Sequence, residues 1–119
     1  MASTKVMVTN ISTGERLADR ADLANNLFTR GRGLLGRAGL DPGEGLVLQP
    51  CGSVHCLGMR FAIDVLHLDR DGLVVRVVRN LRPNRLGPIV RHSHIVVELP
   101  VGSADNTSEG DRVEIRRAA

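Results

Sequence analysis

The sequence is poor in aromatic residues: tryptophan and tyrosine are absent, and Phe28 and Phe61 are its two phenylalanines. Proteins bind single-stranded nucleic acids and sugar rings largely by stacking them on aromatic side chains. We therefore disfavour nucleic acid as a partner. Lysine is scarce too, since Lys5 is the one lysine among sixteen basic residues. Arginine carries nearly all of the positive charge, and arginine suits planar anions such as carboxylate and phosphate.

Long apolar runs are also missing. No stretch approaches the roughly 18 apolar residues that cross a bilayer, and residues 1–10 lack the apolar core of a secretory signal. We expect a cytoplasmic protein that does not span a membrane. The 119 residues, of which 42% are hydrophobic and 24% charged, have the composition of one globular domain over residues 1–119.

Cysteine occurs twice, as Cys51 and Cys56. Extended backbone would separate them by about 16 Å, beyond disulfide reach, although a turn at Gly52 could close this gap. We expect reduced thiols. Zinc favours thiolate and imidazole ligands, which makes both cysteines and His55 weak metal candidates. His55 and Cys56 are adjacent and point to opposite sides of an extended chain, and no CxxC or HxxxH pair is present, so no cofactor is predicted.

The hydrophobic pattern predicts a mainly β fold with one main helix. Strands are predicted at residues 5–9, 16–21, 46–49, 59–68, 73–78, 94–99 and 112–115. The first two form a hairpin, and residues 69–72 form another hairpin turn with Gly72 at positive φ. Asp22 is placed to cap a helix that runs to about Leu35, and residues 102–110 suggest a short helical turn. We expect a small antiparallel barrel-like or curled sheet with the helix across its mouth.

Two acids, Asp64 and Glu98, lie inside apolar runs. A carboxylate is costly to bury unless it is paired. Asp64 is either a fold anchor, held by backbone N–H groups or by an arginine such as Arg37, or a ligand-binding carboxylate or base with a shifted pKa. We expect Asp64 and Glu98 to share one pocket in which arginines neutralise them.

Strand parity limits which groups can meet, because alternate residues of a strand share a face. One face of residues 59–68 carries Arg60, Ala62, Asp64, Leu66 and Leu68, and the other carries Met59, Phe61, Ile63, Val65 and His67. Arg60 and Asp64 share a face, but their Cα atoms would lie about 13 Å apart, so Asp64 needs a partner from elsewhere. A basic run is either a solvated surface or an anion-binding rim: Arg76, Arg79, Arg82, Arg85 and Arg91.

Motifs in a fixed order extend along most of the chain: residues 32–37, 43–46, 53–55, 58–61, 63–65 and 98–99, with Pro83, Gly102 and the pair Gly110-Asp111. On these motifs the chain resembles the bacterial and archaeal family called domain of unknown function 192. The resemblance implies a mainly β domain with one helix, and it implies no activity. The family signature falls on Gly33, Leu34, Arg37, Gly45, Met59, Asp64, Glu98 and Gly102. The chain departs from the family at Leu35, Cys56, Ala62 and His67, and the missing aromatic at His67 disfavours a stacking ligand.

The leading hypothesis is a non-enzymatic ligand-binding or accessory domain. Its polar pocket would be lined by His55, Arg60, Asp64, Glu98 and Arg37, and its ligand would be a small polar or anionic molecule or a peptide segment. One alternative is a hydrolase or transferase that uses His55 as a base with a cysteine or a bound metal. Another is a pure protein-interaction module. The sequence contains no complete catalytic constellation, so no catalytic residue is assigned, and the oligomeric state stays open.

Overall fold

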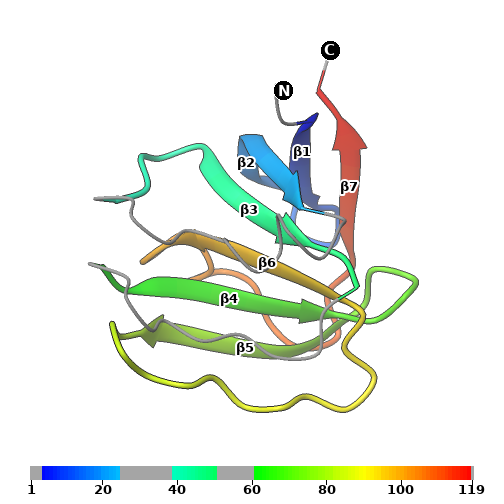
Figure 1. Cartoon of the computed structure of the whole chain (residues 1–119). Coiled ribbons are helices and arrows are strands. Elements are labelled where there is room, and N and C mark those ends of the chain that lie inside the picture. Colours follow the sequence, from blue (N-terminus) through cyan, green and yellow to red (C-terminus); the bar gives the residue numbers. More distant parts are fainter. Residues whose placement is uncertain (1–3, 25–38, 51–60, 119) are drawn as a thin grey trace.

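The structure, a computed structural model, describes residues 4–24, 39–50 and 61–118. Its strands form one continuous sheet (Figure 1). The seven strands are β1 (Thr4–Asn10), β2 (Glu15–Ala24), β3 (Glu44–Leu48), β4 (Ile63–Leu68), β5 (Val74–Leu81), β6 (Ile95–Pro100) and β7 (Val113–Arg117). Their order is β5-β4-β6-β3-β2-β1-β7, and neighbours are antiparallel except β2 and β3, which run parallel. The fold is therefore mainly β, as the sequence predicts.

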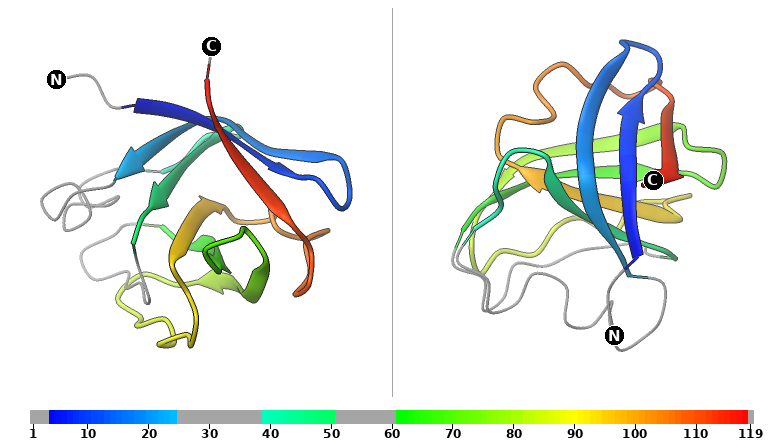
Figure 2. Two further views of the ribbon diagram at one scale, coloured as in Figure 1. Left: turned by 90° about the vertical axis from the view of Figure 1, so that its right-hand side faces the viewer. Right: turned by 90° about the horizontal axis from the view of Figure 1, so that it is seen from above.

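The sheet curls into a half-barrel whose two edge strands, β5 and β7, come together at one point (Figure 2). We call the line between these edge strands the seam. At this point Leu73 and Arg112 form an isolated antiparallel bridge, and the N–H of Val113 donates to the carbonyl of Gly72 at 2.8 Å. Within residues 61–118 no further bridge joins the two edges. The curled sheet agrees with the predicted barrel-like architecture. Two more backbone hydrogen bonds join the edges beside this bridge, from the N–H of Val74 to Asp111 at 2.8 Å and from that of Gly110 to Val74 at 2.9 Å.

Gly72 is the residue that the closure of the seam requires. Its φ of +88° is the positive value that the hairpin turn predicts. A Cβ at this position would also collide with the carbonyl oxygen of Val113. Glycine is therefore needed twice here, once for the left-handed backbone and once for the close approach of two segments.

The predicted start of the helix is wrong. Asp22 lies within β2, where it pairs with Lys5 of β1 and with Leu46 of β3. Pairing on both sides supplies a backbone partner at each position, and this outcompetes the local capping preference of an aspartate. The rest of the predicted helix, residues 25–35, falls outside the described residues. The described residues contain no helix, and residues 102–110 form turns instead of the predicted short helical turn. The described part of the chain therefore includes no helix that could cross a membrane.

Both faces of β4 are buried. The strand begins at Ile63, whereas the sequence predicts a strand from residue 59, and residues 61 and 62 are described and are not strand. All six residues of β4 are buried. Leu66 and Leu68 pack into the concave core of the half-barrel, whereas Ile63 and Val65 join a second apolar cluster on the opposite face. Each apolar residue of β4 therefore lies on the face that its parity predicts.

Candidate functional site

Asp64 is the best-satisfied charged group in the described sheet. Its side chain is 1% exposed. One carboxylate oxygen accepts from the N–H of Asn80 at 3.0 Å, and the other accepts from the N–H groups of Gly102 at 3.0 Å and Ala104 at 3.1 Å. Three charge-assisted bonds to the backbone compensate for the loss of water around the carboxylate. The contacts match the first reading of Asp64, a fold anchor held by backbone N–H groups.

The connection between β6 and β7 is fixed by two further polar side chains. Arg79 of β5 donates to the carbonyls of Ala104 at 3.1 Å and Thr107 at 2.6 Å. Asn10 of β1 is fully buried, and its amide donates to the hydroxyl of Thr107 at 3.1 Å and to the carboxylate of Asp111 at 3.0 Å. The bonds from Asn10 and from a backbone N–H lower the pKa of Asp111. The buried polar atoms of these side chains are therefore satisfied by hydrogen bonds within the protein. Few of their donors and acceptors are left to bind a ligand.

Glu98 is the opposite case, a buried acid without a polar partner among the described residues. It is 3% exposed and lies between Leu46 of β3 and Val65 of β4, its register neighbours. No described residue donates a hydrogen bond to its carboxylate or pairs with it. Burial raises the pKa of Glu98 from 4.5 to about 8. At neutral pH the side chain is therefore mostly a neutral carboxylic acid.

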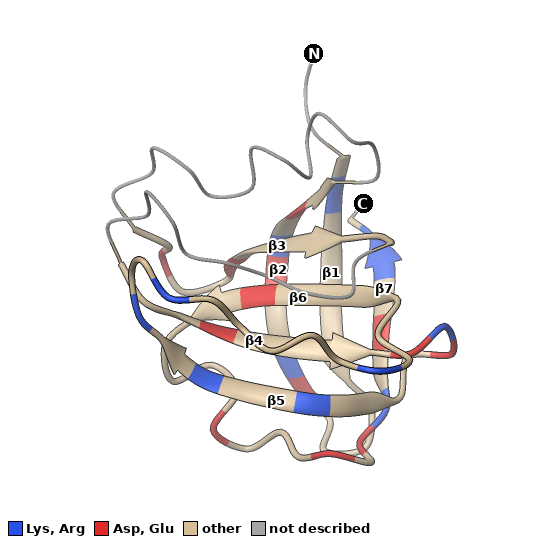
Figure 3. Cartoon of the chain, turned by 60° about the horizontal axis from the view of Figure 1, so that its bottom comes forward, with Lys and Arg blue, Asp and Glu red and all other residues tan. Residues whose placement is uncertain are grey.

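The expected shared pocket of Asp64 and Glu98 does not form. Asp64 is paired with Leu99 and Glu98 with Val65 across the β4–β6 ladder, so the two side chains leave opposite faces of the sheet. The red bands on β4 and β6 in Figure 3 mark these two acids. The prediction fails because parity was known within each strand, whereas the register between the strands was not.

The remaining predicted site residues lie outside the described residues: Arg37, Cys51, His55, Cys56 and Arg60. The cysteine and metal hypotheses that rest on them stay predictions. Within residues 4–24, 39–50 and 61–118, no three His, Cys, Asp or Glu side chains come together in a way that could hold a metal ion.

His67 forms a buried pair that the sequence reasoning missed. It is 0% exposed, and its Nδ1 lies 2.9 Å from the hydroxyl oxygen of Ser93. Its Nε2 has no hydrogen-bond partner among the described residues. Burial, together with the nearby charge of Arg76, lowers the pKa of His67 to about 4. The imidazole is therefore neutral, and among the described residues no acid binds Nε2 as the third member of a catalytic triad would.

A cavity of about 510 Å³ runs along β7, beside the seam; we call it the seam cavity. Six aliphatic side chains of its lining come from strands, and we call them its floor: Val6, Leu23, Leu68, Ile95, Val113 and Ile115. Thr4, Ile11 and Gln49 line the cavity as well. Most side chains of the floor also belong to the concave core or pack against it. The floor is assembled from five different strands, so no single motif announces it in the sequence.

Charged residues surround this apolar floor: Arg70, Asp71, Arg112, Glu114 and Arg117. Arg112 donates to the carbonyl of Asp71 at 2.8 Å, and Glu114 forms an ion pair with Arg116 at 2.8 Å. Arg70 and Arg117 form no ion pair with any described residue. Two guanidinium groups at the rim are therefore available to a ligand.

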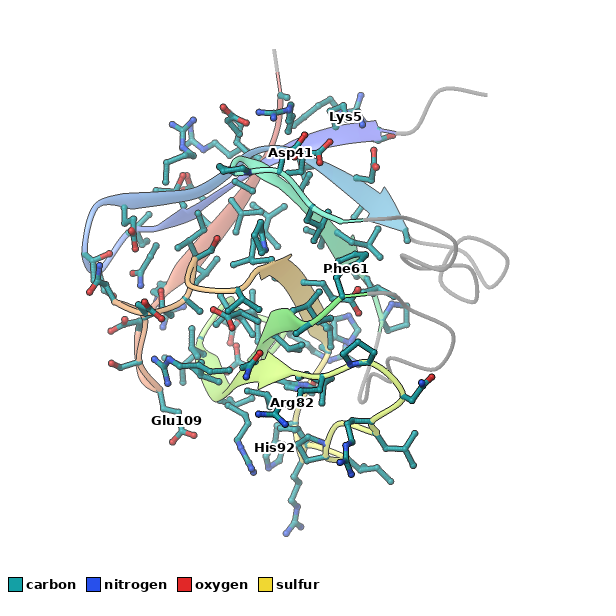
Figure 4. The ribbon with its side chains drawn as sticks, turned by 90° about the vertical axis from the view of Figure 1, so that its left-hand side faces the viewer. Lys5, Asp41, Phe61, Arg82, His92 and Glu109 are labelled. Atoms are coloured by element: carbon teal, nitrogen blue, oxygen red, sulfur yellow. The ribbon has the colours of Figure 1, made fainter. Side chains whose placement is uncertain are left out.

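The predicted basic run does not form one rim. Arg79 is occupied by backbone carbonyls, as described above, while Arg82 and His92 lie on the loop at the far side of the molecule from Lys5 (Figure 4). In this loop Leu86 is 73% exposed and Ile89 89% exposed. A polar recess of about 420 Å³ lies at the end of the loop, where it meets the turn at residues 69–71.

Comparison with known proteins gives a family and a fold. Residues 8–115 match the family DUF192, described as "Uncharacterized ACR". A solved protein of unknown function from Novosphingobium aromaticivorans DSM 12444 has a TM-score of 0.79 and 24% identity, covering 92% of this chain and 83% of that one. A Sinorhizobium meliloti 1021 protein, whose description proposes a transcription regulator, has a TM-score of 0.78 and 23% identity, covering 95% and 93%. No curated protein matches the chain.

Proposed function

Because this chain belongs to the DUF192 family, which brings no activity with it, we propose a function from the geometry alone: a ligand-binding domain whose ligand occupies the seam cavity. The single observation that carries this proposal is the cavity itself, about 510 Å³ in volume. Ligand sites in proteins are commonly hollows of roughly 300–1,000 Å³ with apolar walls and a few polar groups that orient the ligand.

The lining supports a binding site more than a packing defect. Leu23 and Ile115 are partly buried residues that pack against the concave core, and they form part of the floor of the cavity. The hollow is partly open to solvent, so a ligand can reach the aliphatic side chains that line it. A ligand with apolar surface would cover these side chains and gain by leaving water.

The proposal differs from the pocket that the sequence suggested. Asp64 and Glu98 do not line the seam cavity. Asp64 is a fold anchor, whereas Glu98 stays a candidate for a second, polar site on the opposite face of the sheet. The sequence grouped Glu98 with Arg37, His55 and Arg60 in one pocket, and these three residues lie outside the described residues. A cytoplasmic location and a non-enzymatic role are likewise proposals that rest on the sequence.

A thermal-shift screen with matched variants tests the function. Leu23→Phe places a bulkier side chain in the seam cavity, while Leu40→Phe makes the same change at a partly buried leucine of the opposite apolar cluster. A genuine ligand raises the melting temperature of the wild type and of Leu40→Phe but not that of Leu23→Phe. If no compound from a broad metabolite library stabilises the protein, or if every shift survives in Leu23→Phe, the cavity is not a binding site.

A further inference from the structure

We propose that the ligand of the seam cavity is a single-chain aliphatic anion, with its chain on the apolar floor and its carboxylate or phosphate head bound by Arg70 or Arg117. This inference rests on the proposed function and assigns a chemical class to its ligand. Three features of the lining support it: the apolarity of the floor, the charge balance of the rim and the absence of aromatic rings.

The floor requires an apolar tail. Its six side chains are all aliphatic, and they belong to β1, β2, β4, β6 and β7. A polar ligand on this surface would lose its hydration without gaining hydrogen bonds. A hydrocarbon chain has no hydrogen bonds with water to lose, and its transfer from water to an apolar surface is favourable in free energy.

The rim requires a negative head. Three arginines face the cavity against two acids, and one of these acids, Glu114, is already paired with Arg116 at 2.8 Å. Asp71 is therefore the one rim carboxylate that no described ion pair neutralises. The surplus of guanidinium groups favours an anion over a cation, and a guanidinium can bind a carboxylate or phosphate with two parallel hydrogen bonds.

The lining also excludes flat ligands. Its described residues include no aromatic side chain, so a nucleobase, a sugar or another ring would find no surface among them on which to stack. A flexible aliphatic chain needs no such surface and adapts to a cavity bounded by Val, Leu and Ile side chains. The lining therefore favours a ligand with a flexible aliphatic chain over one with a flat ring.

Calorimetric titration with decanoate, decyl phosphate, 1-decanol and acetate tests this inference directly. Decanoate or decyl phosphate is expected to bind at least tenfold more tightly than decanol, which has the chain without the charge, and acetate, which has the charge without the chain, is expected not to bind. Comparison of the two decyl anions shows whether a carboxylate or a phosphate head is preferred. Equal binding of decanol and both decyl anions would overturn the anionic assignment.

Variants locate the head. Arg70→Gln/Arg117→Gln is expected to weaken binding of the decyl anion at least tenfold and to leave decanol unchanged, whereas Arg85→Gln, at an exposed arginine that does not line the cavity, should change neither. An unchanged affinity in the double variant would overturn the role of these arginines. If the decyl compounds fail but another compound binds in a manner that Leu23→Phe abolishes, the inference is wrong and the proposed function stands. If no compound binds in that manner, both fail.

Discussion

Asp64 of β4 and Glu98 of β6 occupy adjacent positions of one strand ladder, yet their side chains lie on opposite faces of the sheet. Their chemical states differ as much as their directions. Three backbone N–H groups bind the Asp64 carboxylate, whereas no described residue binds that of Glu98, and burial raises its pKa to about 8. Amide substitutions at the two positions should therefore change stability in opposite directions.

Asp64→Asn is expected to destabilise the protein by about 3 kcal/mol, because an amide presents an N–H₂ group to at least one buried N–H donor that the carboxylate had satisfied. Urea unfolding measures this change in the free energy of unfolding. Asp105→Asn is the control, since Asp105 is an exposed acid in the same connection, and its effect should stay within about 0.5 kcal/mol. Equal effects of the two substitutions would show that Asp64 is not an anchor.

Glu98→Gln is expected to stabilise the protein at neutral pH. Because the folded pKa of about 8 exceeds the ordinary 4.5, the unfolded chain releases this proton at lower pH than the folded protein does. The wild type therefore loses stability as the pH rises from about 4.5 to about 8. At pH 7 this loss of stability is on the order of 3 kcal/mol, and glutamine, which does not ionise, avoids it. Unfolding curves from pH 4 to pH 9 measure it, and a difference between variant and wild type that does not grow with pH would refute the prediction.

His67→Asn is expected to remove a contribution to stability whose pH dependence is opposite in sign to that of Glu98. Burial and Arg76 lower the folded pKa of His67 from 6.5 to about 4, so the unfolded chain takes up a proton first, and stability falls as the pH falls from 6.5 towards 4. Between about pH 4.5 and 6.5 the contributions of His67 and Glu98 have opposite slopes and nearly cancel.

In His67→Asn the slope of Glu98 should therefore become visible in this window, as stability that falls when the pH rises. Asparagine can keep a hydrogen bond to Ser93, which limits the loss of packing. Parallel profiles of His67→Asn and the wild type between pH 4.5 and 6.5 would show that the buried imidazole does not titrate as described.

Gly72→Ala is expected to cost about 3 kcal/mol, because it combines a strained left-handed backbone with a collision against the Val113 carbonyl. Gly14→Ala isolates the first contribution: Gly14 also has a positive φ, +81°, but no atom within 4 Å of an added Cβ. This control should cost about 1 kcal/mol. Thermal unfolding of both variants separates the stability lost to backbone strain from the stability lost to the collision at the seam. Equal losses of stability in the two variants would contradict a special role for Gly72.

Local features of the fold could be predicted from the sequence because their causes are local. Alternation predicts the strands, and the turn at residues 69–72 requires a glycine whatever surrounds it. The helix start at Asp22 was misjudged because the pairing of β2 with β3 joins residues that are distant in the sequence. The same limit applied to Glu98, whose face depends on its register with Val65.

The seam cavity was beyond prediction for a related reason. Its walls come from both ends of the described chain, from Thr4 to Arg117, and no spacing within one motif connects them. Parity indicates which side of a strand a residue occupies, but it does not indicate how far the sheet curls. The volume of the seam cavity depends on that curl, so the three-dimensional structure is needed to find it.

The contacts of Asp64 have a consequence for how the connection from Gly102 to Asp111 can change during evolution. In this connection the carboxylate accepts hydrogen bonds from main-chain N–H groups, which every residue but proline provides, and not from the side chains of Ser103, Asp105 or Asn106. The path of this connection is therefore specified independently of its exposed side chains. Related proteins could diversify those positions, and engineers could randomise them, while the loop keeps its shape.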